Sequence, residues 1–330
     1  MKFDIESRTI YLARHGSHAY GTNLPTSDID VKGICIPPLA VHFGFLHTFE
    51  QYERMGNNEG GNLHRLRGLV SSDCDLVIYS LKKFAKLAAD CNPNIIEVLF
   101  CSDEDVLEAT PEGEYLRSIR ERFLSKKAKH TFSGYAHAQL KRIKTHRGWL
   151  LNPPMEPSRG AFGLSEKREV SKSDLGAYNA VVERGDELNL PPNIVELLKA
   201  ENAYAQAQRT WQQYLDWQTN RNSARHELEA QFGYDTKHAM HLIRLMRMCR
   251  EILLGKGVIV KRPDAEELLE IRAGRRSYED VVAEAESLNA ECDELYKTTS
   301  YLPHKPDVAA LDAQVVEMTL KYHFRKDFSL

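Results

Sequence analysis

The sequence lacks any apolar run of about 18 residues, the length that a helix needs to cross a bilayer. Its first residues, "MKFDIESRTIY", also lack the apolar core and the small-residue cleavage site of a secretory signal. There is no internal repeat and no low-complexity tail. We therefore expect a cytoplasmic protein that has no membrane partner.

Cysteine is scarce and irregularly spaced, and no two cysteines form a C-x-x-C pair. This spacing favours neither a disulfide framework nor a cysteine-based zinc site, so we expect reduced, buried thiols. The six residues are Cys35, Cys74, Cys91, Cys101, Cys249 and Cys292.

An excess of positive charge is also missing, because 44 Lys and Arg residues face 47 Asp and Glu residues and give a formal net charge of −3. The sequence contains neither a recognised RNA-binding signature nor a strongly basic tract. Any nucleic acid must therefore be bound by local basic surface. A chain of 330 residues is long enough for two lobes.

The first third of the sequence predicts a mixed arrangement of strands and helices. Apolar or β-branched runs predict strands at residues 8–13, 28–37 and 75–79. Ser80 and Asn92 are predicted N-caps, the second with Pro93 at the first helical position. Helical spacing of apolar residues dominates from there on, interrupted by the proline-bearing stretch 150–164, a candidate linker or substrate loop.

The segment "RHGSHAYGTNLPTSDIDVKGICIP", residues 14–37, combines a Gly-Ser turn with two closely spaced acids. In a strand, Asp28 and Asp30 would project from the same side and repel each other unless a cation lies between them. Oxygen ligands on a rigid strand suit Mg²⁺, which completes its coordination with water and substrate phosphates. The alternative is two solvated acids at a strand end.

The Gly16-Ser17 turn lies at a predicted strand-to-helix transition, where backbone N–H groups and the serine hydroxyl can hold phosphate oxygens. Asp75 begins the predicted strand at 75–79 and is the candidate third acid if the two strands are neighbours. Asp73 shares its strand parity and remains the competing choice.

A second set of basic candidates lies in the helical part of the sequence. At 100° per residue, Lys237, His241 and Arg244 fall on one stripe of a predicted helix, where they could bind a triphosphate. The alternative is a solvated basic face. Lys83, near the start of the helix after Asp75, is a further candidate for phosphate binding, with an exposed lysine as its alternative.

The order of these motifs, G-S, then D-x-D, then an acid on a later strand, resembles the nucleotidyltransferase superfamily typified by DNA polymerase β. Within it, the sequence is similar to the RNA-repair-pathway-associated, polymerase-β-like family. The similar segments run from about residue 10 to about residue 305 and include "GSHAYGTNLPTSDIDVKGI", "YSLKKFAKLAADCNPNIIEVLF", "FSGYAHAQLKRI", "FGYDTKHAMHLIRLMRMCREIL" and "EELLEIRAG". The segment "FGYDTKHAMHLIRLMRMCREIL" contains Lys237, His241 and Arg244, and its similarity to the family favours phosphate binding by these three residues over a solvated basic face.

The resemblance implies an α+β fold, with a mixed-sheet, palm-like nucleotidyltransferase domain at residues 1–125 and a mainly helical nucleotide- and acceptor-binding domain at 126–330. It implies that Gly16, Ser17 and metal ions on Asp28 and Asp30 hold a nucleoside triphosphate. Asp75 would complete a second Mg²⁺ or Mn²⁺ site and help to activate the attacking hydroxyl.

The expected activity is transfer of a nucleoside monophosphate to an RNA end, such as tRNA or another small RNA, with release of pyrophosphate. Two alternatives stay open. The first is nucleotidylation of a hydroxyl on a protein or a small molecule, and the second is a non-catalytic nucleotide sensor.

Overall fold

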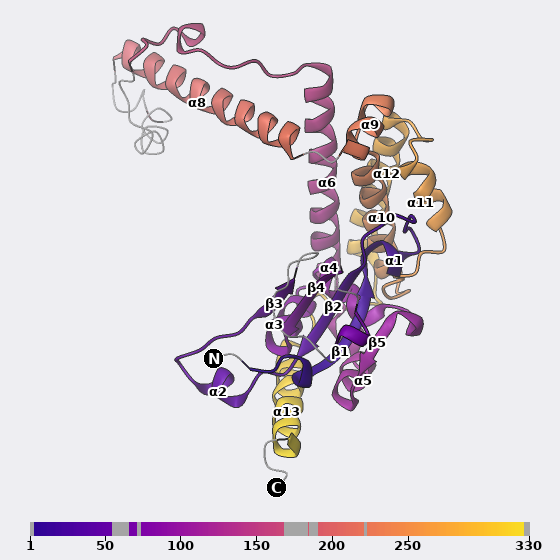
Figure 1. Ribbon diagram of the computed structural model, residues 1–330. Helices are drawn as coiled ribbons and strands as arrows, with labels where there is room; N and C mark the ends of the chain where they lie inside the picture. Colours follow the sequence, from indigo (N-terminus) through magenta and orange to yellow (C-terminus); the bar gives the residue numbers. More distant parts are fainter. Residues whose placement is uncertain are drawn as a thin grey trace. The chain divides into compact units, whose positions relative to one another are not determined.

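The computed structural model describes residues 3–54, 66–70, 74–167, 184, 191–220 and 223–326 (Figure 1). The chain divides into two compact units. The first contains residues 1–142 and 236–330, and the second contains residues 143–235. This division differs from the expected boundary between residues 125 and 126, because the helices at 236–330 pack in the same unit as the sheet.

A five-stranded mixed sheet forms the centre of the first unit (Figure 1). Its strand order is β3-β4-β2-β1-β5. The pair β2·β4 is parallel, and the pairs β1·β2, β1·β5 and β3·β4 are antiparallel. The sheet and the mainly helical region that follows confirm the expected α+β class. The strands are β1 (Thr9–His15), β2 (Asp30–Cys35), β3 (Gln51–Arg54), β4 (Asp75–Ser80) and β5 (Val106–Ala109).

The three strands predicted from apolar runs are the three inner strands, β1, β2 and β4. Two strands were missed, β3 and β5, which lie at the two edges of the sheet. Each is only four residues long and has no fully buried side chain. A short edge strand needs no apolar run, so its sequence carries little strand signal.

Both predicted N-caps are confirmed. The Ser80 hydroxyl accepts a hydrogen bond from the backbone N–H of Lys83, and the Asn92 side chain accepts one from Asn94. In the first unit the helices before residue 143 are α1 (Gly16–Tyr20), α2 (Leu39–Phe43), α3 (Leu81–Ala89), α4 (Pro93–Phe100), α5 (Pro111–Ser118) and the first part of α6 (Lys127–Leu151).

The C-terminal helices of the first unit are α10 (Thr236–Leu253), α11 (Ala265–Arg272), α12 (Tyr278–Thr298) and α13 (Val308–Lys326). Helix α10 packs against α11 and α12, and α13 packs against α3. The six cysteines are free and buried, as expected. Across the described residues, every helix is too short or too polar to cross a membrane.

The second unit is built from the end of α6, α8 (Pro192–Thr219) and α9 (Ser223–Phe232). The proline-bearing stretch at 150–164 belongs to it and contains a short 3₁₀ turn at Arg159–Phe162. Arg159 forms a two-pronged ion pair with the fully buried Glu201 of α8, with N···O distances of 2.6 and 3.1 Å. This ion pair ties the stretch to α8.

A buried carboxylate joins the sheet to helix α10. Glu97 of α4 is 0% exposed and accepts hydrogen bonds from Arg244 Nη1 at 2.7 Å and from the Tyr20 hydroxyl at 2.5 Å. His15 Nε2 lies 3.3 Å from the same carboxylate, and the Arg244 guanidinium sits 3.8 Å above the Tyr20 ring. Burial opposes ionisation of Glu97, but Arg244 and these hydrogen bonds outweigh it and hold its pKa well below the usual range.

Removing Arg244 should therefore destabilise the first unit strongly. We expect Arg244→Met to lower the free energy of unfolding by about 3–5 kcal/mol, because Glu97 would remain buried without its counter-charge. Urea denaturation at pH 7 measures the change. The double variant Glu97→Gln/Arg244→Met should recover part of the loss, since it buries no charge. A loss below about 1 kcal/mol in the single variant would contradict this account.

Candidate functional site

Two carboxylates lie side by side at one edge of the sheet. Asp30 is the first residue of β2 and Asp75 is the first residue of β4, and the two are direct partners in the parallel register. The backbone N–H of Asp75 donates to the carbonyl of Ile29 at 3.0 Å and fixes that register. Directly paired residues of neighbouring strands point to the same face of the sheet, so both carboxylates project to one side.

Asp28 comes two residues before Asp30 and is exposed, outside the strand itself. Burial raises the pKa of the Asp30 carboxyl above its usual value, and the negative charges of Asp75 and Asp28 raise it further. The ammonium groups of Lys32 and Lys237 act in the opposite direction. The charges of Asp28 and Asp75 thus both act on the carboxyl group of Asp30.

Gly16 lies against this group, at the expected transition from β1 to α1. Its φ of +67° is in the left-handed region, and a Cβ built on it would lie 2.1 Å from Asp30 Oδ2. Only glycine fits here, both for the backbone angle and for the close approach. Ser17 follows it and is half-buried. Helix α1 has only five residues, so the phosphate binding predicted at Gly16 and Ser17 would depend on backbone N–H groups and not on a helix dipole.

The basic stripe of α10 divides into three different environments. Lys237, in the first turn, is half-buried, and its charge acts on the Asp30 carboxyl. Burial, with the neighbouring charges of Arg244 and Lys237, lowers the pKa of His241 to about 3, so this imidazole is neutral near pH 7. Arg244 is only 4% exposed, and its guanidinium is bound to Glu97. Lys237 is therefore the member that presents positive charge to the carboxylates.

The structure does not bring Lys83 to the carboxylates. Lys83 lies in the first turn of α3, which begins where β4 ends, whereas Asp75 is the first residue of that strand. Its ammonium group forms an ion pair with Glu50 at 2.7 Å. The intervening strand is about 17 Å long, so Lys83 lies at the opposite end of β4 from Asp75. The competing acid, Asp73, lies outside the described residues.

Two polar residues close to Asp30, His15 and Lys32, were not among the residues predicted from the sequence. His15 is the cross-strand partner of Asp30, and burial lowers its pKa to about 4. Lys32, two residues after Asp30 on the same face, donates to the carbonyl of Asn94 at 2.7 Å. Burial lowers its pKa to about 8, against the effect of two nearby carboxylates. Lys32 could have been found from strand alternation, because it continues the spacing of Asp28 and Asp30.

The chemistry of the three acids suits a divalent cation, because Asp28, Asp30 and Asp75 carry the hard oxygen atoms that Mg²⁺ prefers. Burial is the main cause of the raised pKa of Asp30, and a cation beside it would also relieve the repulsion from Asp75 and Asp28. Within the described residues, these three carboxylates are not gathered within 4.8 Å of one another as a ligand set. Lys32 and Lys237 compensate part of this negative charge from the protein side. The arrangement can therefore hold a metal ion together with a phosphate-bearing ligand.

Residues 2–149 match the family described as the RNA repair pathway DNA polymerase beta family. The match covers the whole sheet and confirms the resemblance seen in the sequence. It ends at residue 149, so the similar segments at 232–253 and 266–274 lie beyond it.

One curated relative is an uncharacterized 38.9 kDa protein in the nrdC-mobD intergenic region of Enterobacteria phage T4. It is 31% identical over 134 residues, which are 40% of this chain and 38% of the phage protein. The similarity thus spans well under half of the relative's length. No solved structure matches the chain.

The raised pKa of Asp30 predicts that its ionised carboxylate lowers the free energy of unfolding at neutral and higher pH. Folding strengthens proton binding at Asp30, so stability falls as the pH rises from the ordinary carboxyl range through the raised pKa. Asp30→Asn removes this cost and should raise the melting temperature at pH 8, with a gain that fades below about pH 4. The matched control is Asp312→Asn, at an exposed position on α13. A melting temperature at or below that of the wild type at pH 8 would refute the prediction.

The close approach of Gly16 to Asp30 can be tested against a second glycine at the other end of α1. Gly21 has a φ of +73°, but an added Cβ would meet its nearest atom only at 3.6 Å. Gly21→Ala should therefore lower the free energy of unfolding by about 1–2 kcal/mol, which is the cost of placing alanine in a left-handed backbone conformation. Gly16→Ala should lower the free energy of unfolding by clearly more, because the added Cβ also collides with the Asp30 carboxylate. Urea denaturation of both variants measures the difference. Equal losses in the two variants would show that the collision is absent.

Proposed function

We propose that the first unit transfers a nucleoside monophosphate from a nucleoside triphosphate to a hydroxyl acceptor. One observation carries this proposal, namely the in-register pair Asp30 and Asp75 next to the glycine that opens α1. The family that residues 2–149 match supports it, since polymerase-β-type chemistry is nucleotidyl transfer. In this reaction the hydroxyl oxygen bonds to the α-phosphorus, the bond between the α- and β-phosphates breaks, and pyrophosphate leaves.

Each residue of the site has a separate role in the proposed reaction. The backbone N–H groups of Gly16 and Ser17 and the serine hydroxyl hold phosphate oxygens. Lys237 offers its ammonium group to the triphosphate from α10. Asp75 orients the attacking hydroxyl and takes up its proton.

Asp28, Asp30 and Asp75 are the residues that would hold a divalent cation. Bound there, Mg²⁺ or Mn²⁺ would supply positive charge beside the α-phosphate and the departing pyrophosphate. Arg244 has a positioning role in this scheme, because it holds Glu97, while the neutral His241 can serve only as a hydrogen-bonding group.

For the acceptor we propose the end of an RNA, a tRNA or another small RNA, in line with the RNA repair named in the family description. The formal net charge of −3 favours an acceptor that is held locally over a long duplex. The hydroxyl of a protein or a small molecule is the alternative acceptor for the same chemistry.

The test follows label from each α-³²P nucleoside triphosphate, with Mg²⁺ or Mn²⁺, in the presence and absence of mixed small RNAs. Asp30→Asn and Asp75→Asn should each lower the rate of label transfer to the acceptor by at least about a hundredfold, because charge stabilisation in the transition state is lost. Asp312→Asn should keep full activity, since it lies on the exposed face of α13.

The position of the label distinguishes the acceptors. Label on RNA would support both the proposed reaction and the proposed acceptor. Label on the protein would support nucleotidyl transfer but would show that the acceptor is a protein hydroxyl. Triphosphate binding without turnover under any of these conditions would contradict nucleotidyl transfer and indicate a nucleotide sensor.

A further inference from the structure

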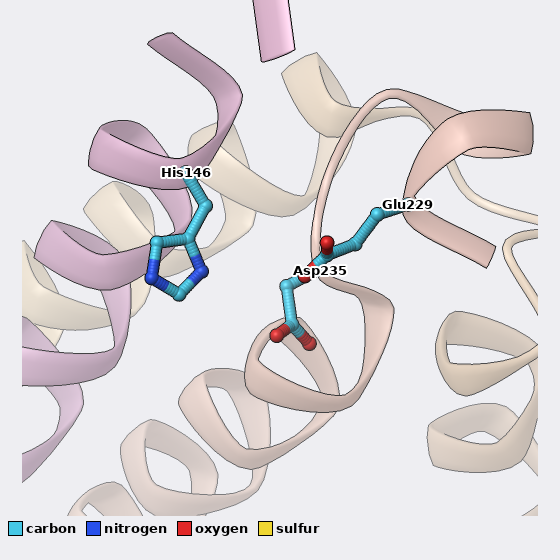
Figure 2. A group of neighbouring side chains, drawn as sticks. All are labelled: His146, Glu229 and Asp235. Atoms are coloured by element: carbon cyan, nitrogen blue, oxygen red, sulfur yellow. The ribbon is translucent and has the colours of Figure 1, made fainter. Parts of the chain in front are cut away.

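Three side chains of the second unit point toward one another from three separate segments (Figure 2). His146 comes from the end of α6, Glu229 from α9, and Asp235 from the turn that precedes α10. One ligand atom from each lies within 4.8 Å of the others. Glu229 is 2% exposed and Asp235 is 3% exposed, so two carboxylates are buried beside one imidazole.

Burying two carboxylates in one place requires nearby positive charge, because an uncompensated charge is costly to remove from water. An arginine is close: Arg147 Nη1 donates to the carbonyl of Gly233, in the same turn, at 3.1 Å. This hydrogen bond holds the turn against α6. A divalent cation bound by both carboxylates and by an imidazole nitrogen would compensate the buried charge and would use all three side chains.

The imidazole is held in a fixed orientation by aromatic rings. The rings of Trp149 and His146 are stacked, with centroids 5.6 Å apart and planes at 25°. Trp217 of α8 packs against the same imidazole at 5.2 Å. Such contacts restrict the ring and limit water at its faces, which is how proteins support a metal-binding histidine.

We propose that His146, Glu229 and Asp235 bind a divalent ion of the zinc class and thereby fasten α6 to the segment that joins α9 to α10. One nitrogen and two carboxylate oxygens form a donor set that suits Zn²⁺, with a fourth position for water, whereas Mg²⁺ prefers oxygen ligands alone. This site lies wholly within residues 143–235 and is separate from the carboxylates of the sheet.

Metal binding would hold the three segments at fixed distances. Ligand atoms of a tetrahedral zinc site are roughly 3.3–3.6 Å apart, which follows from bond lengths of about 2.0–2.2 Å. The three ligand atoms here all lie within 4.8 Å of one another. Because α6 and the segment after α9 must keep the bonding distances, binding couples to the stability of the second unit.

The first experiment measures Zn²⁺ binding to the untagged full chain by calorimetry in the Asp30→Asn/Asp75→Asn background, which removes the carboxylate pair of the sheet. We expect one equivalent of Zn²⁺. His146→Ala should weaken binding more than about tenfold, and His137→Ala, an exposed histidine on the same helix α6, should leave it unchanged. The absence of binding in the background protein, or equal binding in both histidine variants, would overturn the proposal.

A second readout covers the case in which His146→Ala fails to fold. Asp235→Asn and Glu229→Gln keep the side-chain shape and remove a metal ligand. Zn²⁺ should raise the melting temperature of the background protein and not that of either variant. If both variants are destabilised but still respond fully to Zn²⁺, the cluster is an ion-pair network with Arg147 and binds no metal.

Discussion

The buried charge of Glu97 is the constraint on which the arrangement of the first unit depends. A carboxylate with no solvent exposure must be compensated, and the groups that compensate it come from three different elements: Arg244 from α10, Tyr20 from α1 and His15 from β1. Satisfying this one charge therefore fixes α10 and α1 against α4, next to β1. As a consequence, the first turn of α10 and the glycine that opens α1 both lie beside Asp30.

The site itself is maintained at a cost to stability. Asp30 is held near Asp75 and Asp28 in a partly buried place where like charges repel, and only part of this repulsion is offset by Lys32 and Lys237. A chain selected for stability alone would not keep such a group. The arrangement is typical of a site prepared for a positively charged ligand, whose binding then contributes to the stability of the fold.

The sequence predicted the parts of the structure that follow from local pattern. The inner strands β1, β2 and β4 and both N-caps agree with it. The pairing of β2 with β4 meets the condition on which Asp75 was the candidate third acid. It could not show which basic residues face the site, because helical spacing places Arg244 and Lys237 on one stripe whether they meet a carboxylate, a phosphate or water. The pairing of Arg244 with Glu97, 147 positions apart, is set by tertiary packing. The same holds for the return of residues 236–330 to the first unit, which no local pattern indicates.

The proposed function requires that a metal ion and a triphosphate share the edge of the sheet at Asp30 and Asp75. The most direct measurement is anomalous diffraction from crystals grown with Mn²⁺ and a nucleoside triphosphate analogue that resists cleavage between its α- and β-phosphates. The account predicts an anomalous peak bonded to both carboxylates, with phosphate oxygens against the backbone of Gly16 and Ser17. A triphosphate bound elsewhere, with no manganese at this edge, would contradict it.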